Sequence, residues 1–331
     1  MIALRAVAKT VVCLFKVYPM LPSKPIDWVT PRPIVERLGY QTSVGDAEGD
    51  LYRPSSPGPH PGVVVCLGVV PFGVEHPQVP RLGEALARSG FAALLYWSPA
   101  MRDFRLDPAD VEDIASAYDA LLARPDIDPA RSGLLGTCVG GAFALMAASS
   151  PRVRDRVNFV MAYAPYASMW TLARDIASAS RCHDGAREPW DVDPLTRKVF
   201  EHSIGALLQD SGEPQPLLGA LGPIEAERAL QSLSPDLRKW LDDLSPIAYL
   251  SDVRAPLIVL LHDRDDPVIP VDESRRLRDA LAHRAGVRYT EFTVFKHLDP
   301  SKGHPSAIAL TRELMRFGRA VYPVFEVAVS N

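Results

Sequence analysis

The chain has 331 residues, of which 47% are hydrophobic and 23% charged, and this composition excludes a disordered or fibrous protein. Its 36 basic and 40 acidic side chains give a formal net charge of −4, and no block of Lys or Arg could neutralise many phosphates, so nucleic acid is not an expected partner. Four cysteines without a CxxC pair predict neither a disulfide framework nor a zinc site, and they favour the cytoplasm. The length predicts one large domain or a domain with a sizeable insertion.

Residues 1–22 are the first predicted element, an amphipathic helix. The apolar stretch is too short to span a bilayer, and a signal peptide would carry its positive charge ahead of that stretch. The helix is expected to pack on its own domain or on a second subunit of a homodimer, with peripheral attachment to a membrane surface as the alternative. The two faces consist of Leu4, Val7, Val11, Leu14, Phe15 and Tyr18 on the apolar side, and Arg5, Lys9 and Lys16 on the basic side.

Residues 23–165 show short β-rich runs that alternate with helical patterns. The run Gly62 to Leu67, GVVVCL, is continuously apolar, which is typical of a strand covered on both faces. Strands that alternate with helices imply βαβ units and a mostly parallel sheet. The predicted elements are a hairpin over 39–44 and 49–53, strands over 62–67, 91–96, 133–136 and 157–162, and helices over 79–89, 108–123 and 139–148.

The regular alternation stops near Pro165 and resumes with the apolar run PLIVL at 256–260. The intervening residues 166–254 contain helical patterns and no recognised strand pattern, so they are expected to form a helical insertion that acts as a lid. Residues 255–331 then complete the core. The remaining elements are helices over 170–178, 194–208, 224–232 and 236–241 in the insertion, followed by a helix over 273–285, a strand over 288–295 and a helix over 305–321.

A G-x-C-x-G pattern lies between the strand that ends at 136 and the helix that starts at 139. In a nucleophile elbow the central residue occupies a strained turn, and glycines two positions before and after it avoid a steric clash. Gly136 and Gly140 meet that requirement around Cys138. The pattern therefore predicts that Cys138 is a nucleophile at a helix N-terminus, where backbone amides can stabilise negative charge.

A nucleophile of this kind needs a general base and an acid that orients the base. The segment HDRDDPVIP follows a buried strand, and from it Asp266 is the predicted acid, with Asp263 and Asp265 as competitors. The last predicted strand leads into His297, the predicted base, while His304 is the alternative base. Because ligands bind at the carboxyl edge of a parallel sheet, these side chains are expected to meet there.

On these motifs, the chain resembles the α/β-hydrolase family, and more narrowly its dienelactone hydrolase-like branch, which uses a cysteine in the elbow. The resemblance covers about 39–321 without the insertion, and it depends on GTCVGG at 136–141, DDPVIP at 265–270 and the order nucleophile, acid, histidine. It implies the α/β-hydrolase fold, a mostly parallel sheet flanked by helices. Members of that branch carry a glutamate before a loop phenylalanine, and here Val70 replaces it, which puts their activation mechanism in question.

The predicted oxyanion hole combines the amide of Val139 with that of Val69 or Val70. The predicted activity is hydrolysis of an ester, lactone or thioester of a small-molecule acyl substrate, through an acyl-thioester on Cys138 and without metal or organic cofactor. Two alternatives stay open. One is an acyltransferase that uses the same cysteine, as in polyester synthases, which share the elbow pattern; the other is a non-catalytic binder of an apolar ligand.

Overall fold

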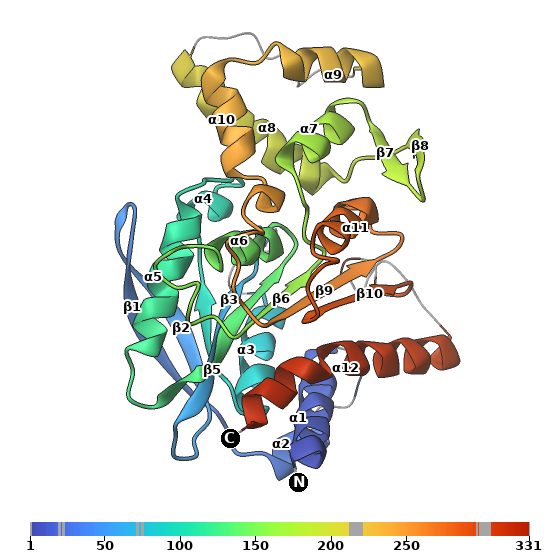
Figure 1. Cartoon of the computed structure of the whole chain (residues 1–331). Helices are drawn as coiled ribbons and strands as arrows, with labels where there is room; N and C mark the ends of the chain where they lie inside the picture. Colours follow the sequence, from blue (N-terminus) through green and yellow to red (C-terminus); the bar gives the residue numbers. More distant parts are fainter. Residues whose placement is uncertain are drawn as a thin grey trace.

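The computed structural model describes residues 2–18, 21, 24–70, 73, 76–211, 221–295, 297 and 306–330. Its centre is an eight-stranded sheet of order β1-β2-β4-β3-β5-β6-β9-β10 (Figure 1). β1 and β2 form an antiparallel hairpin, β2 runs antiparallel to β4, and the strands from β4 to β10 are parallel. The strands are β1 (Ile34–Thr42), β2 (Gly45–Arg53), β3 (His60–Cys66), β4 (Ala92–Tyr96), β5 (Ile127–Thr137), β6 (Phe159–Tyr163), β9 (Leu257–Asp263) and β10 (Val287–Phe292).

Both faces of this sheet are covered, as the continuous apolar runs predicted. In β3, Val64 and Cys66 face one apolar cluster, while Val63 and Val65 face the other. The first cluster lies under α4 (Pro99–Arg102), α5 (Asp110–Leu122), α6 (Val139–Ala147) and α11 (Val271–Ala280), and the second under α1 (Ile2–Val17), α3 (Gln78–Arg88) and α12 (Ala307–Val329).

The N-terminal helix α1 packs on its own domain, beside α3 and α12, and α2 (Lys24–Val29) follows it. In its N-terminal half the buried residues are Ala6 and Thr10, whereas Leu4 of the predicted apolar face is 76% exposed. The expectation that the apolar face would cover the domain is therefore wrong for the N-terminal half of the helix. Small side chains face inward because they allow the helices to approach closely. None of the described helices is long and apolar enough to cross a membrane.

Residues 166–254 form a group of helices above the carboxyl edge of the sheet (Figure 1). The absence of strands from this segment was wrongly predicted, because β7 (Ser180–His183) and β8 (Ala186–Pro189) pair antiparallel. Their two-residue turn is Asp184-Gly185, and both residues have positive φ, 49° and 82°. An Asp-Gly turn of this kind is a strong hairpin signal. The helices are α7 (Met169–Ala177), α8 (Pro194–Ser211), α9 (Pro223–Gln231), α10 (Pro235–Asp243) and the 3₁₀ helix η1 (Pro246–Ala248).

Candidate active site

Cys138 occupies a tight turn between β5 and α6. Its φ of 55° and ψ of −135° are unusual for a residue with a side chain, and such a conformation persists only when the surroundings hold it. Two backbone hydrogen bonds do so: the amide of Cys138 donates to the carbonyl of Tyr163 (2.8 Å), and its own carbonyl accepts from the amide of Gly141 (2.9 Å). The neighbouring strand and the first turn of α6 thus fix the position of the thiol.

The two glycines of the predicted elbow lie where no side chain fits. A Cβ atom on Gly136 would lie 2.2 Å from the carbonyl oxygen of Gly140, and one on Gly140 would lie 2.2 Å from the carbonyl oxygen of Cys66. Both clashes involve backbone, which cannot move without displacing a strand. The G-x-C-x-G spacing therefore has a steric reason in this structure.

Asp266 lies in the loop after β9 and is fully buried. Its Oδ1 accepts hydrogen bonds from the amides of Val268 (2.8 Å) and Ile269 (3.0 Å), and its Oδ2 accepts one from Nδ1 of His297 (2.6 Å). Burial alone would raise the pKa of Asp266, but the charge of His297 and these hydrogen bonds hold it below its ordinary value. The carboxylate therefore stays ionised beside the imidazole.

His297 contacts both Asp266 and Cys138. Its Nδ1 is engaged by Asp266, and the imidazole also has a hydrogen bond with the Cys138 side chain. Burial lowers the pKa of His297, yet the negative charges of Asp266 and Cys138, together with the hydrogen bonds to both, raise it well above its ordinary value. This arrangement favours a proton on the imidazole when the cysteine is a thiolate.

The competing residues lie elsewhere. Asp263 accepts from the amides of Phe295 (3.1 Å) and His297 (3.0 Å) and from the hydroxyl of Tyr163, so it holds the backbone of the histidine loop rather than the imidazole. Asp265 is exposed. The alternative base His304 lies outside the described residues. The contact of Asp263 with the backbone of the histidine loop was not predicted, because the sequence alone does not distinguish Asp263 from Asp265 and Asp266.

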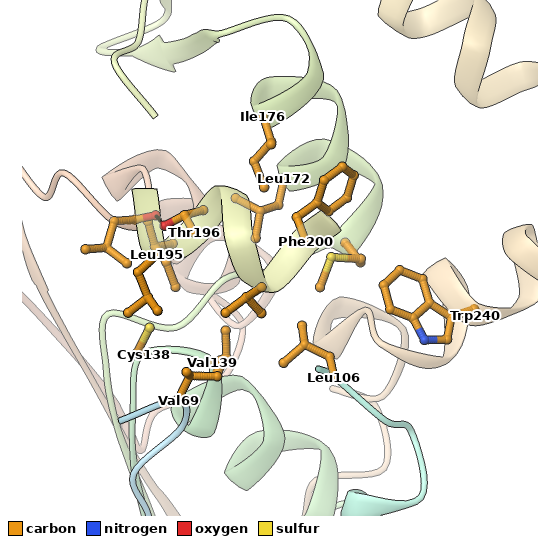
Figure 2. A pocket seen from close by; sticks show the side chains of 14 residues that line it. Val69, Leu106, Cys138, Val139, Leu172, Ile176, Leu195, Thr196, Phe200 and Trp240 are labelled. Carbon is orange, nitrogen blue, oxygen red and sulfur yellow. Dashed lines mark hydrogen bonds between the residues drawn. The ribbon is translucent and has the colours of Figure 1, made fainter. Parts of the chain in front are cut away.

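An apolar pocket opens over Cys138, and with its mouth it encloses about 510 Å³. Figure 2 shows Cys138 and Trp240 on opposite sides of it. Its floor consists of core residues and its roof of side chains from α7, α8 and α10. None of the described residues that line it carries a charged side chain. The floor residues are Val69, Leu106, Cys138, Val139, Val268 and Ile269, and the roof residues are Met169, Leu172, Ile176, Leu195, Thr196, Val199, Phe200 and Trp240.

The predicted oxyanion residues lie beside the elbow. Val69 and Val139 line the pocket with Cys138, and the loop after β3 approaches α6 closely: a Cβ atom on Gly140 would lie 2.5 Å from the amide nitrogen of Gly68. Val70 packs against the apolar cluster on the opposite side of the sheet. Of the two alternatives, Val69 is thus the one that lines the same pocket as Cys138.

A buried carboxylate ties the roof to the core. Glu273 of α11 accepts from the amides of Ala167 (2.9 Å) and Ser168 (3.1 Å), which precede α7, and from the hydroxyl of Thr171 (2.6 Å). These amides would otherwise lack partners at the start of the helix. Sequence reasoning did not identify Glu273, because its partners are more than one hundred positions away.

The fold is the α/β-hydrolase fold. A hydrolase of 2,6-dihydroxy-pseudo-oxynicotine superposes with a TM-score of 0.56 at 17% identity, over 88% of this chain and 68% of that one. DcsB, solved with a substrate analogue, gives 0.54 at 17% identity over 86% of this chain and 99% of that one. The α/β-hydrolase GrgF from Penicillium gives 0.52 at 18% identity, over 87% and 99%.

Curated proteins match a shorter part of the chain. Human mitochondrial acyl-coenzyme A thioesterase 2 is 32% identical over 108 residues, which are 32% of this chain and 21% of that protein. A probable 2-oxo-3-(5-oxofuran-2-ylidene)propanoate lactonase of Bradyrhizobium is 33% identical over 127 residues, or 33% of this chain and 49% of that protein. The chain thus spans half or less of the length of these relatives. No family model matches the sequence.

Proposed function

We propose that this protein hydrolyses an ester, thioester or lactone of an apolar acyl group through a covalent intermediate on Cys138. The observation that carries the proposal is the chain of contacts from the Cys138 thiol to His297 and from His297 to the buried carboxylate of Asp266. A base held in one tautomer by an ionised carboxylate is what activation of a nucleophile requires.

In the first half-reaction His297 takes the thiol proton, and the Cys138 sulfur attacks the acyl carbon. The carbonyl oxygen becomes an oxyanion, for which the amides of Val139 and Val69 are the proposed donors. When the tetrahedral intermediate collapses, the bond to the leaving oxygen or sulfur breaks, and His297 gives its proton to that atom. The products are an acyl-thioester on Cys138 and a free alcohol or thiol; a lactone leaves its hydroxyl on the acyl group.

In the second half-reaction water replaces the leaving group. His297 removes a proton from the water, the hydroxide attacks the thioester carbon, and the Cys138 sulfur leaves and regains a proton from the imidazolium. The carboxylic acid is released and the resting thiol is restored. If an alcohol occupies the place of the water, the same steps give acyl transfer.

Two observations support the choice of substrate bond. The described residues that line the pocket next to Cys138 are all uncharged, which suits an apolar acyl chain and disfavours a charged one. The curated relatives include two acyl-coenzyme A thioesterases and a lactonase. The elbow cysteine further favours the dienelactone hydrolase-like branch, although Val70 replaces the glutamate of that branch. The four unpaired cysteines favour a reducing compartment such as the cytoplasm.

The proposal is tested with a panel of p-nitrophenyl esters, acyl thioesters and lactones. Cys138→Ala should abolish turnover, and Cys138→Ser should keep a trace. Incubation of His297→Ala with substrate should show little acyl adduct by mass spectrometry. Cys182→Ala, a substitution of another partly exposed cysteine, is the control and should retain full activity.

Alkylation by iodoacetamide supplies an independent measurement. Cys138 should react before Cys13, which is half-buried and whose pKa desolvation raises to about 12, and before the buried Cys66, whose pKa burial also raises. Full turnover by Cys138→Ala would contradict the proposal. Binding of acyl substrates without turnover in the wild type would favour the non-catalytic binder, and loss of activity in His304→Ala but not in His297→Ala would identify the other base.

A further inference from the structure

The N-terminal half of the apolar side of α1 faces away from the domain, whereas Leu14 of its C-terminal half and Tyr18 just beyond it are half-buried. Leu4 is 76% exposed, Val7 48% and Val11 42%, whereas Ala6 and Thr10 of the same helix are buried. The helix is nevertheless closely packed, since α12 presents Gly318 to it: a Cβ atom there would lie 3.1 Å from Leu14. A firmly held helix therefore leaves a row of aliphatic side chains without a partner in the described part of the chain.

The adjacent helix α12 also exposes apolar side chains. Ile308 is 85% exposed and Met315 is 55% exposed, and between and beside them Arg312, Arg316 and Arg319 are also exposed. We call this surface the α1–α12 face: Leu4, Val7, Val11, Ile308 and Met315 with Arg5, Lys9, Arg312, Arg316 and Arg319. Figure 1 shows both helices at the end of the molecule opposite the roof.

The charge of the α1–α12 face is opposite to that of the whole chain, which is −4. The two helices contain six basic residues and two acidic ones. Of the acidic residues, Glu313 is buried and lies 3.8 Å from Arg316, while the exposed Glu326 accepts from the hydroxyl of Tyr322. Of the basic residues, Lys16 is buried against Asp27. The exposed surface of the pair is thus basic and apolar together.

A hollow on the flank of α1 concentrates positive charge further. Arg5, Lys9 and Arg131 line it, and it encloses about 730 Å³ of space that includes open solvent. Arg131 is paired with Asp128 (2.6 Å). Burial, followed by the charges of Arg5 and Arg131, lowers the pKa of Lys9, so the positive groups repel one another there. An anionic group bound in the hollow would relieve that repulsion.

We propose that the α1–α12 face docks the protein on the surface of an anionic membrane, with the aliphatic side chains in the headgroup region and the cations against lipid phosphates. This combination of an apolar row and flanking Lys and Arg is the pattern of interfacial helices. A second copy of the chain fits the face less well, because two basic surfaces would meet. The neighbouring α2 adds Trp28, 81% exposed, and tryptophan is enriched at membrane interfaces.

The test is co-sedimentation of the full chain with vesicles of phosphatidylcholine, alone or mixed with phosphatidylserine. The wild type should bind the mixed vesicles and not the neutral ones, and added salt should weaken binding. Leu4→Ser/Val7→Ser/Val11→Ser should remove most of the binding. Arg312→Gln/Arg319→Gln should weaken it by about 30-fold, since each surface cation contributes about fivefold.

The controls are Val44→Ser/Ile224→Ser, which changes exposed apolar residues far from the face, and Arg254→Gln, which removes an exposed charge elsewhere. Both should bind vesicles like the wild type, and thermal melting checks that every variant is folded. Failure of the wild type to bind mixed vesicles, or equal binding by the triple variant, overturns the proposal. A dimer in sedimentation velocity that the triple variant abolishes would also overturn it and would identify a second copy as the occupant.

Discussion

The floor and the roof of the pocket are built by different kinds of interaction. On the floor, the backbone around Cys138 is fixed by hydrogen bonds to β6 and by glycines that lie against neighbouring backbone. The roof contributes apolar side chains from three helices, and its link to the core includes the carboxylate of Glu273. Positions on the floor therefore tolerate no change of backbone shape, while positions in the roof tolerate changes of size. In the proposed reaction the reacting atoms belong to the first region, and selection among acyl chains is proposed for the second.

One substitution made in both regions tests this difference most strongly. Gly140→Ala places a Cβ atom 2.2 Å from the carbonyl of Cys66 and should reduce kcat/KM by more than about 100-fold, because a small displacement of the nucleophile suffices for that. In the roof helix α8, Gly205→Ala meets no atom within 4 Å and should stabilise the protein by about 0.5 to 1 kcal/mol. Ester hydrolysis measures the effect of Gly140→Ala on kcat/KM, and urea denaturation measures the effect of Gly205→Ala on stability. A harmless Gly140→Ala would show that the elbow is not tightly constrained.

The support beneath the histidine gives the next largest effect. Asp263→Asn replaces a carboxylate whose two oxygens accept from the amides of Phe295 and His297. The Asn side chain has one oxygen, so its NH2 group would face one of these two donors. We expect kcat to fall by about 10- to 100-fold and alkylation of Cys138 to slow, with KM nearly unchanged. Asp265→Asn, at an exposed neighbour, is the control. Equal rates for the two variants would mean that Asp263 does not position the base.

Trp240→Leu, a substitution in the roof, should change which acyl chains are hydrolysed best and leave the reactivity of Cys138 unchanged. Trp240 lies across the pocket from Cys138, so a smaller side chain lengthens the space for the acyl group (Figure 2). The ratio of kcat/KM for longer to shorter acyl esters should rise about tenfold, since each methylene in an apolar pocket is worth about 1 to 3 kcal/mol. Alkylation of Cys138 should not change. Trp170→Leu is the control, because the indole of Trp170 donates to Asp242 and does not line the pocket. The same change in the kcat/KM ratio in that variant would contradict the proposal that Trp240 limits the length of the acyl chain.

The smallest effect on activity is expected at Asp110, a buried carboxylate of the core. Its oxygens accept from Tyr96 (2.7 Å) and Ser98 (2.6 Å), and burial raises its pKa from 3.8 to about 6. The folded state therefore holds this proton more tightly than the unfolded state, so the contribution to stability is present at low pH and is lost as the pH rises from 3.8 to about 6. The free energy of unfolding therefore declines over this pH range, and Asp110→Asn should reduce the decline, measured by urea titration, by at most about 3 kcal/mol. An unchanged pH profile would contradict the raised pKa.

Local patterns predicted the floor better than the roof. The apolar run of β3 and the G-x-C-x-G turn depend on neighbours in sequence, and both lie where the patterns placed them. The β7–β8 hairpin was missed although Asp184-Gly185 signals it, because its strands are short and polar. The hydrogen bonds of Glu273 with Ala167 and of Asp263 with His297 join residues that are far apart in sequence and meet only in the folded chain.

The helix α1 shows a different reason for failure. Its amphipathic pattern indicates which side is apolar, but it does not indicate which side meets the domain. Packing against α12 is decided by size, since Thr10 and Leu14 lie near Gly318, and this close approach directs Leu4 and Val7 to the outside. Hydrophobic pattern and buried face are therefore separate properties of a short terminal helix.

The place at which the roof joins the sheet also affects how the gene can evolve. The chain leaves the sheet after β6 and returns to it at β9, and these two strands are paired neighbours from Phe159 and Leu257 onwards. Cys138, Asp266 and His297 all lie outside this interval. A gene segment that encodes residues 164–256 can thus be exchanged, lengthened or mutated as a unit while the three residues of the proposed reaction are copied unchanged. Duplicated copies of such a gene can diverge in the molecules they accept and still share one chemistry.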